Sequence, residues 1–279
     1  MKILITGSSG FIGKKIIEIF KNDESILIIR TTRHKENIKK NVFYYDIFQN
    51  QSNTNLFEYF GCPDIVLHCA WDNVKNSNYL SHINDQVNYH IKFIDNLVIN
   101  GLKKITVLGT CHEYGMNNGE SLETQIANPI TNYGIAKDFL RRYIENLNKE
   151  HEFIFQWIRI FNVYDKTGKT GNNNLISQLR NSVDNKESAF NMTYGEKKLD
   201  FIEINELCFM IKKIIMQNKI NGIINCCSGS PQTILDLINN CLKDWGETID
   251  LNRGYYNYRE YEPDCFYGST KKLNSILYK

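Results

Sequence analysis

The sequence predicts an α/β fold in which a parallel β-sheet lies between layers of helices. One observation is that short, almost continuously apolar runs recur along the first two thirds of the chain, with helical patterns between them. The other is that the first run, residues 2–6, leads through glycines into an apolar-periodic stretch at residues 11–20. Strands that are apolar at nearly every position are typical of a sheet covered on both faces.

Composition limits the class of protein. The chain has 279 residues, of which 42% are hydrophobic and 23% are charged, as is ordinary for a globular protein. A formal net charge of +2 gives no strong attraction to nucleic acid or to a membrane surface. The sequence has no membrane-spanning run, no export signal and, among eight cysteines, no C-x-x-C pair. We therefore expect a cytoplasmic protein with reduced thiols and no metal site.

The glycines of the first turn lie three residues apart, at Gly7, Gly10 and Gly13. A strand, a glycine turn and a helix in this order predict a dinucleotide-binding site. Gly7 permits the tight turn, Gly10 lets a pyrophosphate approach the backbone, and Gly13 lets the helix pack against the strand. Amides at the start of the helix then bind the phosphates. The alternative is a glycine-rich turn that binds nothing.

The second predicted strand, residues 26–29, is followed by a basic segment that contains Arg30, Thr31 and Arg33. In a dinucleotide fold an acidic residue at this place binds a free ribose 2′-hydroxyl, and arginine accommodates a 2′-phosphate. No acidic residue occurs between Ile26 and Lys35. The segment therefore favours NADP(H) over NAD(H), and the alternative is a solvated basic loop.

The remaining elements follow from the same patterns. Further strands are predicted at residues 42–45, 64–70, 105–108, 153–160 and 223–226. Helices are predicted at 83–100 and 205–218, because apolar residues recur there every three or four positions. Residues 165–174 are predicted to form a loop. The segment 254–268 is rich in tyrosine, which suits either a surface that covers a ligand or an aromatic cap over a small core.

Tyr133 and Lys137 are four residues apart at the start of an apolar-periodic run, so on a helix they share one face. A free tyrosine titrates near pH 10, and a neighbouring ammonium lowers the pKa of the phenol. A positioned acid works best when its pKa approaches the working pH. The pair therefore predicts proton transfer by Tyr133, and a chance pair on a helix is the alternative.

Several motifs together resemble the extended short-chain dehydrogenase/reductases, an epimerase/dehydratase superfamily. They are TGSSGFIG at 6–13, Asp46-Ile47, DIVLHCAW at 64–71, Tyr133-x-x-x-Lys137, RIFNVY at 159–164 and LDFIEINEL at 199–207. The resemblance implies a Rossmann-type doubly wound parallel sheet with a smaller C-terminal substrate-binding region. The implied cofactor-binding domain is 1–163, to which 197–228 returns, and the substrate-binding region is 164–196 with 229–279.

The resemblance also implies roles for individual residues. Tyr133 is the acid or base at the substrate, Lys137 holds the nicotinamide ribose, and Thr110 binds the substrate oxygen. The alternative for Thr110 is a residue that caps a turn at the end of a strand. The expected cofactor-binding residues are Gly7, Ser9, Gly10, Phe11, Ile12, Gly13, Arg30, Thr31, Arg33, Asp46, Ile47, Cys69, Ala70, Trp71, Tyr133 and Lys137. The expected substrate-binding residues are Trp71, His112, Asn162, Asn174, Arg253 and Tyr261.

Departures from the family pattern indicate the reaction. Sugar 4,6-dehydratases of this family carry Asp-Glu after the threonine, because elimination of water needs its own acid and base. This chain has Cys111 and His112 there, which disfavours dehydration. Epimerases of the family usually have an acidic residue after the second strand, where this chain has Arg30. Net reduction by a cofactor that enters and leaves is the expectation that remains.

A closer resemblance, to bacterial 4-ketoreductases of nucleotide-linked 4-keto-6-deoxyhexoses, lies in four segments. They are GTCHEYG at 109–115, FNMTYGE at 190–196, INCCSG at 224–229 and LNRGYYNYREYEPDCFYG at 251–268. It implies a dTDP-linked substrate, a product such as dTDP-fucose for surface polysaccharides, and a homodimer through helices 83–100 and 133–148. One departure is Lys198-Leu199-Asp200, where relatives often have Arg-Asp.

Three other functions remain open from the sequence. One is an NAD-dependent nucleotide-sugar 4-epimerase, and another is a reductase of a different carbonyl compound. The third is a non-catalytic regulatory protein that senses the cofactor on the same fold. Such regulatory proteins commonly lose the catalytic pair, whereas Tyr133 and Lys137 are both present here.

Overall fold

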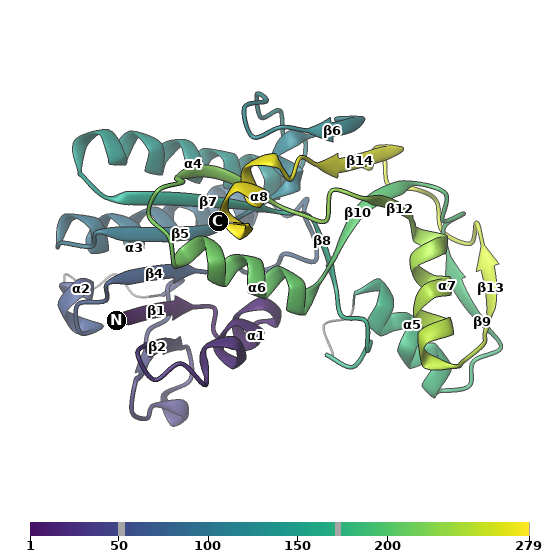
Figure 1. The fold of residues 1–279 in the computed structure, drawn as a ribbon, viewed down its shortest axis with the longest axis horizontal. Helices are drawn as coiled ribbons and strands as arrows, with labels where there is room; N and C mark the ends of the chain where they lie inside the picture. Colours follow the sequence, from purple (N-terminus) through teal and green to yellow (C-terminus); the bar gives the residue numbers. More distant parts are fainter. Residues whose placement is uncertain (50–53, 171–173, 279) are drawn as a thin grey trace.

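A seven-stranded sheet forms the centre of the computed structural model, which describes residues 1–49, 54–170 and 174–278 (Figure 1). The strand order is β11-β7-β5-β4-β1-β2-β3, and every neighbouring pair is parallel. The strands are β1 (Lys2–Thr6), β2 (Leu27–Thr32), β3 (Val42–Tyr44), β4 (Ile65–His68), β5 (Lys104–Thr110), β7 (Ile154–Ile160) and β11 (Gly222–Cys226). This arrangement confirms the predicted α/β, Rossmann-type fold class.

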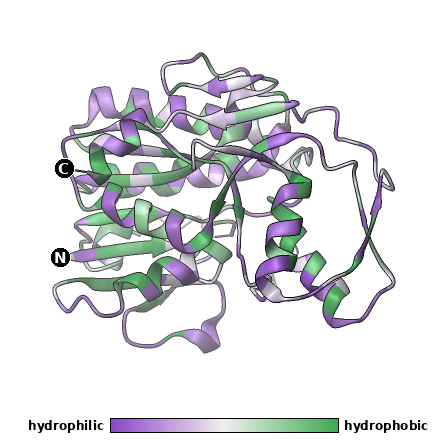
Figure 2. Cartoon of the chain, turned by 45° about the vertical axis from the view of Figure 1, so that its right-hand side comes forward, coloured by the Kyte–Doolittle hydropathy of each residue, from purple (hydrophilic) through white to green (hydrophobic). Residues whose placement is uncertain are grey.

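Helices cover both faces of this sheet. The helices on one face are α1 (Phe11–Phe20), α6 (Ile204–Ile215) and α8 (Lys271–Leu277). Those on the other are α2 (Leu56–Tyr59), α3 (Val87–Ile99) and α4 (Asn132–Glu150). Successive side chains of a strand point to opposite faces, so Ile3 and Ile5 pack toward α1 and α6, and Leu4 packs toward α3 and α4. The middle of β1, residues 3–5, is therefore apolar at every position, and Figure 2 shows this part of the strand green.

A second region lies to the right in Figure 1, beyond the carboxyl ends of the central strands. Its mixed sheet contains β6 (Gly119–Ser121), β8 (Asn162–Tyr164), β10 (Lys198–Glu203), β12 (Pro231–Thr233) and β14 (Cys265–Gly268). Two further strands, β9 (Ala189–Met192) and β13 (Asp250–Arg253), pair in parallel. Helices α5 (Leu175–Asp184) and α7 (Ile234–Trp245) pack beside them around a separate apolar core.

Most predicted elements are present, with shifted ends. The strand predicted at 26–29 continues to Thr32, because β2 pairs with β3 as far as Thr32 and Tyr44. The helix predicted at 83–100 begins as a π-helical turn, His82–Gln86, before α3. Part of the loop predicted at 165–174 lies outside the described residues. The domain boundaries remain a prediction, and β10, which they assign to the cofactor-binding domain, pairs with strands of the second sheet.

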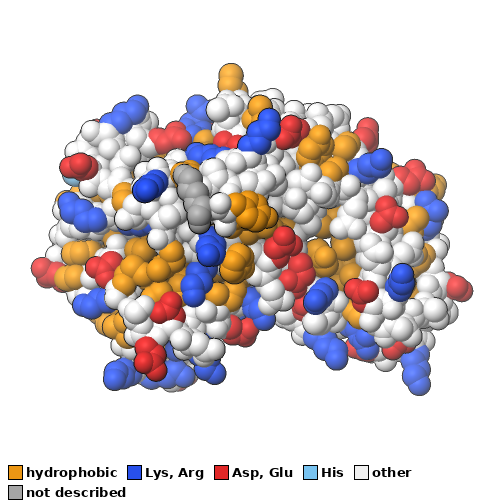
Figure 3. Space-filling view, in the orientation of Figure 1, with side chains coloured by type: hydrophobic (Ala, Val, Ile, Leu, Met, Phe, Trp, Pro, Cys, Tyr) orange, Lys and Arg blue, Asp and Glu red, His pale blue; other side chains and the backbone are white. Residues whose placement is uncertain are grey.

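The strand order reverses between β1 and β4, because the chain continues outward through β2 and β3 on one side and through β5, β7 and β11 on the other. In open α/β sheets, ligands bind at the carboxyl ends of the strands beside such a reversal. On the face shown in Figure 3, basic and acidic side chains are interspersed, as the near-neutral net charge leads us to expect. No helix in the described part of the chain combines the length and apolar character that crossing a bilayer requires.

Candidate active site

The glycine turn lies at the strand reversal. Gly7 has a φ of +63°, and a Cβ atom added to it would lie 2.8 Å from the backbone nitrogen of Ala70, which follows β4. A Cβ atom on Gly13 would lie 2.3 Å from the carbonyl oxygen of Gly7. Gly10 is the N-cap of α1 and provides no side-chain cap for the first amides of the helix. The turn is therefore packed closely from both sides and suits the approach of a pyrophosphate.

A cavity opens beside this turn. Predicted residues that line it are Gly7, Ser9, Gly10, Thr31, Arg33, Ile47, Cys69, Ala70 and Trp71. Residues that the sequence analysis missed are Thr32, His34, Tyr45, Phe48 and Asp72, together with Thr6 and Phe93. Phe93 comes from α3, and the others lie at or just after strand ends, beside residues that were predicted or in the segments after β2 and β3.

Four predicted cofactor residues line neither this cavity nor the adjoining one described below: Phe11, Gly13, Arg30 and Asp46. Gly13 acts through packing, and Phe11 packs against the core on the α1 face. Asp46 is buried and accepts a hydrogen bond from the amide of Phe48 at 3.1 Å. Arg30 lies within β2, one residue before the segment that lines the cavity, which begins at Thr31.

A second cavity continues from the first and contains the three predicted catalytic residues. Thr110 ends β5, while Tyr133 and Lys137 lie in the first two turns of α4, and all three line the cavity. The start of α4 is held in place because Thr131 caps it, accepting a hydrogen bond from the amide of Gly134 at 3.1 Å. Other predicted residues that line this cavity are Ile12, Cys69, Trp71, His112, Asn162 and Tyr261.

Burial determines the titration of the catalytic pair. Lys137 is 2% exposed, and its Nζ donates a hydrogen bond to the carbonyl oxygen of Leu108 at 2.8 Å. Burial lowers the pKa of Lys137 to about 7. The pKa of Tyr133 is raised, first by burial and then by the charge of Glu113, although a hydrogen bond to Thr110 opposes this. The expectation that the ammonium lowers the tyrosine pKa is therefore wrong for this structure, because desolvation dominates.

Thr110 caps a turn, and its predicted contact with the substrate oxygen in the cavity remains a prediction. It lines the cavity, and its hydroxyl also accepts a hydrogen bond from the amide of His112 at 3.2 Å, capping the 3₁₀ helix Cys111–Tyr114. Its own amide donates to Glu113 Oε1 at 2.9 Å. Sequence analysis missed the fully buried Glu113. The signal was present, because Thr-x-x-Glu is a capping box.

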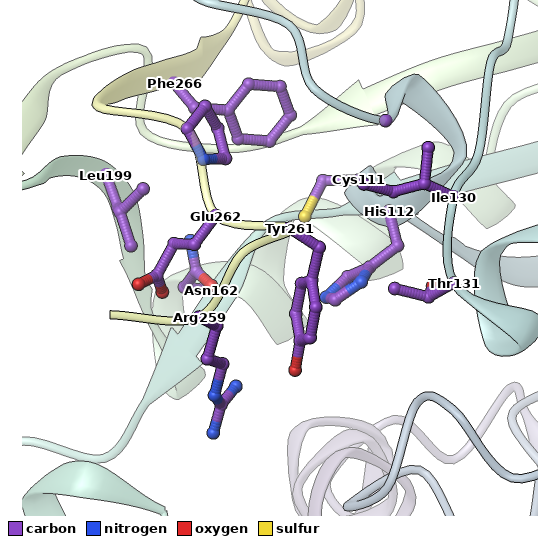
Figure 4. Close-up of a pocket in the computed structure, with 12 residues that line it drawn as sticks. Cys111, His112, Ile130, Thr131, Asn162, Leu199, Arg259, Tyr261, Glu262 and Phe266 are labelled. Carbon is purple, nitrogen blue, oxygen red and sulfur yellow. The ribbon is translucent and has the colours of Figure 1, made fainter. Parts of the chain in front are cut away.

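A third cavity adjoins the catalytic one and includes residues of the C-terminal segment. Figure 4 shows Arg259, Tyr261 and His112 extending into the same space. The His112 ring centroid lies 6.0 Å from that of Tyr133 and 6.0 Å from that of Tyr261. Burial, together with the charge of Arg259, lowers the pKa of His112 to about 4, so this imidazole is neutral at pH 7. Asn162 lines both cavities.

Two predicted substrate residues lie outside the linings of these cavities. Arg253 donates to the carbonyl oxygen of Tyr194 at 3.0 Å and to Glu196 Oε1 at 3.1 Å, because β13 pairs with β9 beside that segment. Asn174 caps α5 by accepting a hydrogen bond from the amide of Ser177 at 2.9 Å. The arginine that lines both the second and the third cavity is Arg259, which sequence analysis missed.

Comparison with known proteins agrees with this geometry. The chain is 29% identical over 276 residues to the dTDP-6-deoxy-L-talose 4-dehydrogenase (NAD(+)) of Aggregatibacter actinomycetemcomitans, covering 96% of this chain and 100% of that protein. It is 24% identical over 282 residues to the GDP-6-deoxy-D-talose 4-dehydrogenase of the same organism, covering 99% and 91%. The fold matches UDP-N-acetylglucosamine 4-epimerase from Methanobrevibacter ruminantium M1 with a TM-score of 0.83, 21% identity, and coverage of 100% and 92%.

The family assignment rests on a match that spans most of the chain. The profile of the NAD dependent epimerase/dehydratase family matches residues 3–227, which include the glycine turn, Thr110, Tyr133 and Lys137. This match confirms the resemblance to the extended short-chain dehydrogenase/reductases. The chain therefore belongs to the NAD dependent epimerase/dehydratase family.

Proposed function

We propose that the chain reduces the C4 keto group of a nucleotide-linked 4-keto-6-deoxyhexose. The observation that carries the proposal is the convergence of Thr110, Tyr133 and Lys137 in a cavity that adjoins the glycine-turn cavity, with Cys69 and Trp71 lining both. Two relatives are named as 4-dehydrogenases of dTDP-linked and GDP-linked 6-deoxytaloses, which supports redox chemistry at this carbon.

The close-packed glycine turn suits a dinucleotide, because the backbone leaves no room for a Cβ atom at Gly7 or Gly13, and Gly10 provides no side-chain cap for the first amides of α1. When bound, the nicotinamide dinucleotide supplies the hydride. Tyr133 is protonated at neutral pH, because its pKa is raised, so its hydroxyl can donate a proton to the substrate oxygen at C4. Thr110, which lines the same cavity, holds that oxygen. A positioned donor of this kind is typically worth about 3 kcal/mol.

The lining residues suggest how the substrate binds. Arg259 is placed to neutralise a diphosphate, for which a guanidinium offers charge-assisted hydrogen bonds. His112, Tyr261 and Asn162 surround the space next to Tyr133, where the sugar ring belongs. We favour a dTDP-linked sugar, in agreement with the name of one relative. The products to test are dTDP-6-deoxyhexoses, fucose and 6-deoxytalose among them.

We propose NADP(H) as the preferred cofactor. Arg33 lines the dinucleotide cavity, and the segment from Ile26 to Lys35 has no acidic residue that would repel a 2′-phosphate. Arg33 pairs with Asp72 at 3.2 Å, but both side chains are about half exposed, so this surface ion pair is weak and easily exchanged. One relative is named for NAD(+), so both cofactors belong in the assay.

A nucleotide-sugar 4-epimerase is the second candidate. Its support is the name of one relative from Methanocaldococcus jannaschii, “Putative UDP-glucose 4-epimerase”, which is 25% identical over 289 residues. An epimerase retains its cofactor and consumes none. A regulatory protein without catalysis is less well supported, because Tyr133 and Lys137 are both in place. We further propose a cytoplasmic homodimer through α3 and α4 that serves the synthesis of surface polysaccharide sugars.

The decisive experiment measures oxidation of NADPH and of NADH with dTDP-, GDP-, CDP- and UDP-4-keto-6-deoxyhexoses, followed by NMR of the products. Net oxidation with formation of a C4 hydroxyl supports the reductase. Interconversion of C4 epimers without net consumption of cofactor supports the epimerase instead. Absence of turnover with every sugar, in a folded protein that binds the cofactor, contradicts both enzymatic proposals.

A further inference from the structure

We infer that Trp71 is a positioning residue for Lys137 and that its indole face holds the lysine ammonium within the catalytic cavity. The Nζ atom of Lys137 lies 3.9 Å from the Trp71 ring centroid. It lies 5.8 Å from the centroid of Tyr133 and 6.0 Å from that of Trp157. The ammonium is therefore enclosed by three aromatic rings, and Trp71 is much the closest. The inference rests on the proposed function only in giving Lys137 a catalytic role.

The ammonium of Lys137 needs such a partner. No carboxylate oxygen of the described residues lies within ion-pair distance of its Nζ, which is bonded to the carbonyl oxygen of Leu108. A buried cation without a counter-ion is unstable in its charged form. The face of an indole attracts a cation more strongly than that of a phenol or phenyl ring, and most strongly where water is excluded. Trp71 therefore stabilises the charged form of Lys137.

The indole of Trp71 is itself held firmly. Its Nε1 donates a hydrogen bond to His82 Nδ1 at 3.1 Å, and its other side stacks on His90 with centroids 4.3 Å apart and planes at 2°. His90 Nδ1 is hydrogen-bonded to His68 Nε2 at 2.8 Å, and His68 Nδ1 is hydrogen-bonded to the hydroxyl of Thr6 at 2.8 Å. The stacking contact with His90 and two hydrogen bonds therefore connect the indole to Thr6, the last residue of β1, and a separate hydrogen bond ties it to His82.

The histidines that surround Trp71 are neutral, so they do not repel the ammonium of Lys137. Burial lowers the pKa of His68 to about 3 and also lowers the pKa of His82 and of His90, so none adds a positive charge at pH 7. The titratable groups that interact with Lys137 from all sides are Tyr133 on its own helix, His68 and Cys69 from the end of β4, Glu113, His82 and His90. Glu113 and Cys69 favour its charged form.

The first test compares Trp71→Leu with Trp71→Phe. Leucine removes the π face, so less Lys137 is charged at a given pH, and the alkaline limb of the kcat/KM profile moves to lower pH. At pH 8 we expect a loss of at least about tenfold for Trp71→Leu. Phenylalanine keeps a π face and recovers part of the activity. Trp245→Leu is the matched control, because Trp245 makes a comparable contact with Arg180, 5.1 Å from its ring centroid, outside the catalytic cavity.

A second measurement needs neither cofactor nor turnover. Tryptophan emission of the free protein is titrated from pH 6 to pH 9 and compared with that of Lys137→Met. A transition near pH 7 that disappears in Lys137→Met shows that an indole senses the ammonium, and its loss in Trp71→Phe identifies that indole. This test still applies if Trp71→Leu fails to fold.

Two results would overturn the inference. One is a folded Trp71→Leu enzyme whose pH profile coincides with those of the wild type and of Trp245→Leu. The other is an identical emission titration for the wild type and Lys137→Met. Failure of the proposed function would give a different result. The wild-type protein would turn over no nucleotide sugar, but its tryptophan emission would still change with the titration of Lys137.

Discussion

Glu113 accepts a hydrogen bond from Arg159 through its Oε2 atom, 2.8 Å from Arg159 Nε, in an ion pair that is buried beneath the catalytic cavity. The other oxygen, Oε1, accepts from the amide of Thr110 at 2.9 Å and from Trp157 Nε1 at 2.9 Å. One carboxylate thus joins β7 to the end of β5. The position of Thr110 therefore depends on a charge pair that has no contact with solvent.

Replacing Glu113 with alanine leaves the Arg159 guanidinium buried without its partner. We expect a loss of about 3–5 kcal/mol in the free energy of unfolding, measured by urea denaturation. The matched control is Glu196→Ala, which removes the partner of Arg253 from an exposed ion pair and is expected to cost at most about 1 kcal/mol. Equally small losses in the free energy of unfolding for both variants would show that the buried Glu113–Arg159 pair stabilises the fold no more than the exposed pair does.

Tyr133→Phe removes the hydroxyl and leaves the ring, which packs beside His112 and His82. We expect the variant to fold and to bind cofactor with near-normal affinity, because the hydroxyl contacts Thr110 and no core residue depends on it. Turnover is expected to fall about 10²–10⁴-fold, as for the loss of a positioned acid. Cofactor binding is measured by calorimetry and turnover by oxidation of the reduced nucleotide. Near-normal turnover would remove Tyr133 from the mechanism.

Local patterns in the sequence were sufficient for the central sheet and for the pairing of Tyr133 with Lys137 on one helix, whereas Thr110 was predicted from the family resemblance. Gly7 and Gly13 predict a tight turn, and the spacing of Tyr133 and Lys137 predicts that they share a helix face. Both predictions were possible because the members of each pair are only a few residues apart in the sequence. Glu113 was predictable in principle from its capping box with Thr110. The remainder of the site depends on the long-range arrangement of segments that no local period encodes.

Arg259 and Trp71 illustrate the two ways in which the sequence alone was insufficient. Arg259 belongs to an irregular segment, so only its packing next to Asn162 and Tyr261 distinguishes it from Arg253. Trp71 was predicted as a ligand contact, but its contacts with Lys137 and His90 cross between β4, α3 and α4. Contacts between side chains from such distant segments can be identified only when the arrangement of the strands and helices is known.

Arg259→Ala tests the assignment of the diphosphate site. Removing a hydrogen bond to a charged group costs about 1.5–3 kcal/mol, so the KM for the nucleotide sugar is expected to rise about 10–100-fold. The KM for the reduced cofactor is expected to change little. Arg253→Ala is the matched control, since its guanidinium pairs with Glu196 outside the cavities. If Arg253→Ala raised the substrate KM and Arg259→Ala did not, our assignment would be reversed.

The lowered pKa of Lys137 also gives a prediction for the pH dependence of the free energy of unfolding. Its pKa is about 7 in the folded chain, below the usual 10.5, because burial disfavours the charged form. Between these two values the unfolded chain binds a proton that the folded chain has released, so the free energy of unfolding contributed by this group rises with pH. Below pH 7 both states are protonated, and the cost of the buried charge is present in full. Urea denaturation from pH 7 to pH 10 measures this slope.

In Lys137→Met the buried charge is absent, so this variant is expected to gain stability relative to the wild type at pH 7, with the gain shrinking as the pH approaches 10. The contrast isolates Lys137 from other groups, because every other titrating residue is common to both proteins. Parallel curves for the two proteins over this range would mean that the ammonium of Lys137 is as well solvated in the folded chain as in the unfolded one. The aromatic enclosure by Trp71, Tyr133 and Trp157 would then have no electrostatic consequence.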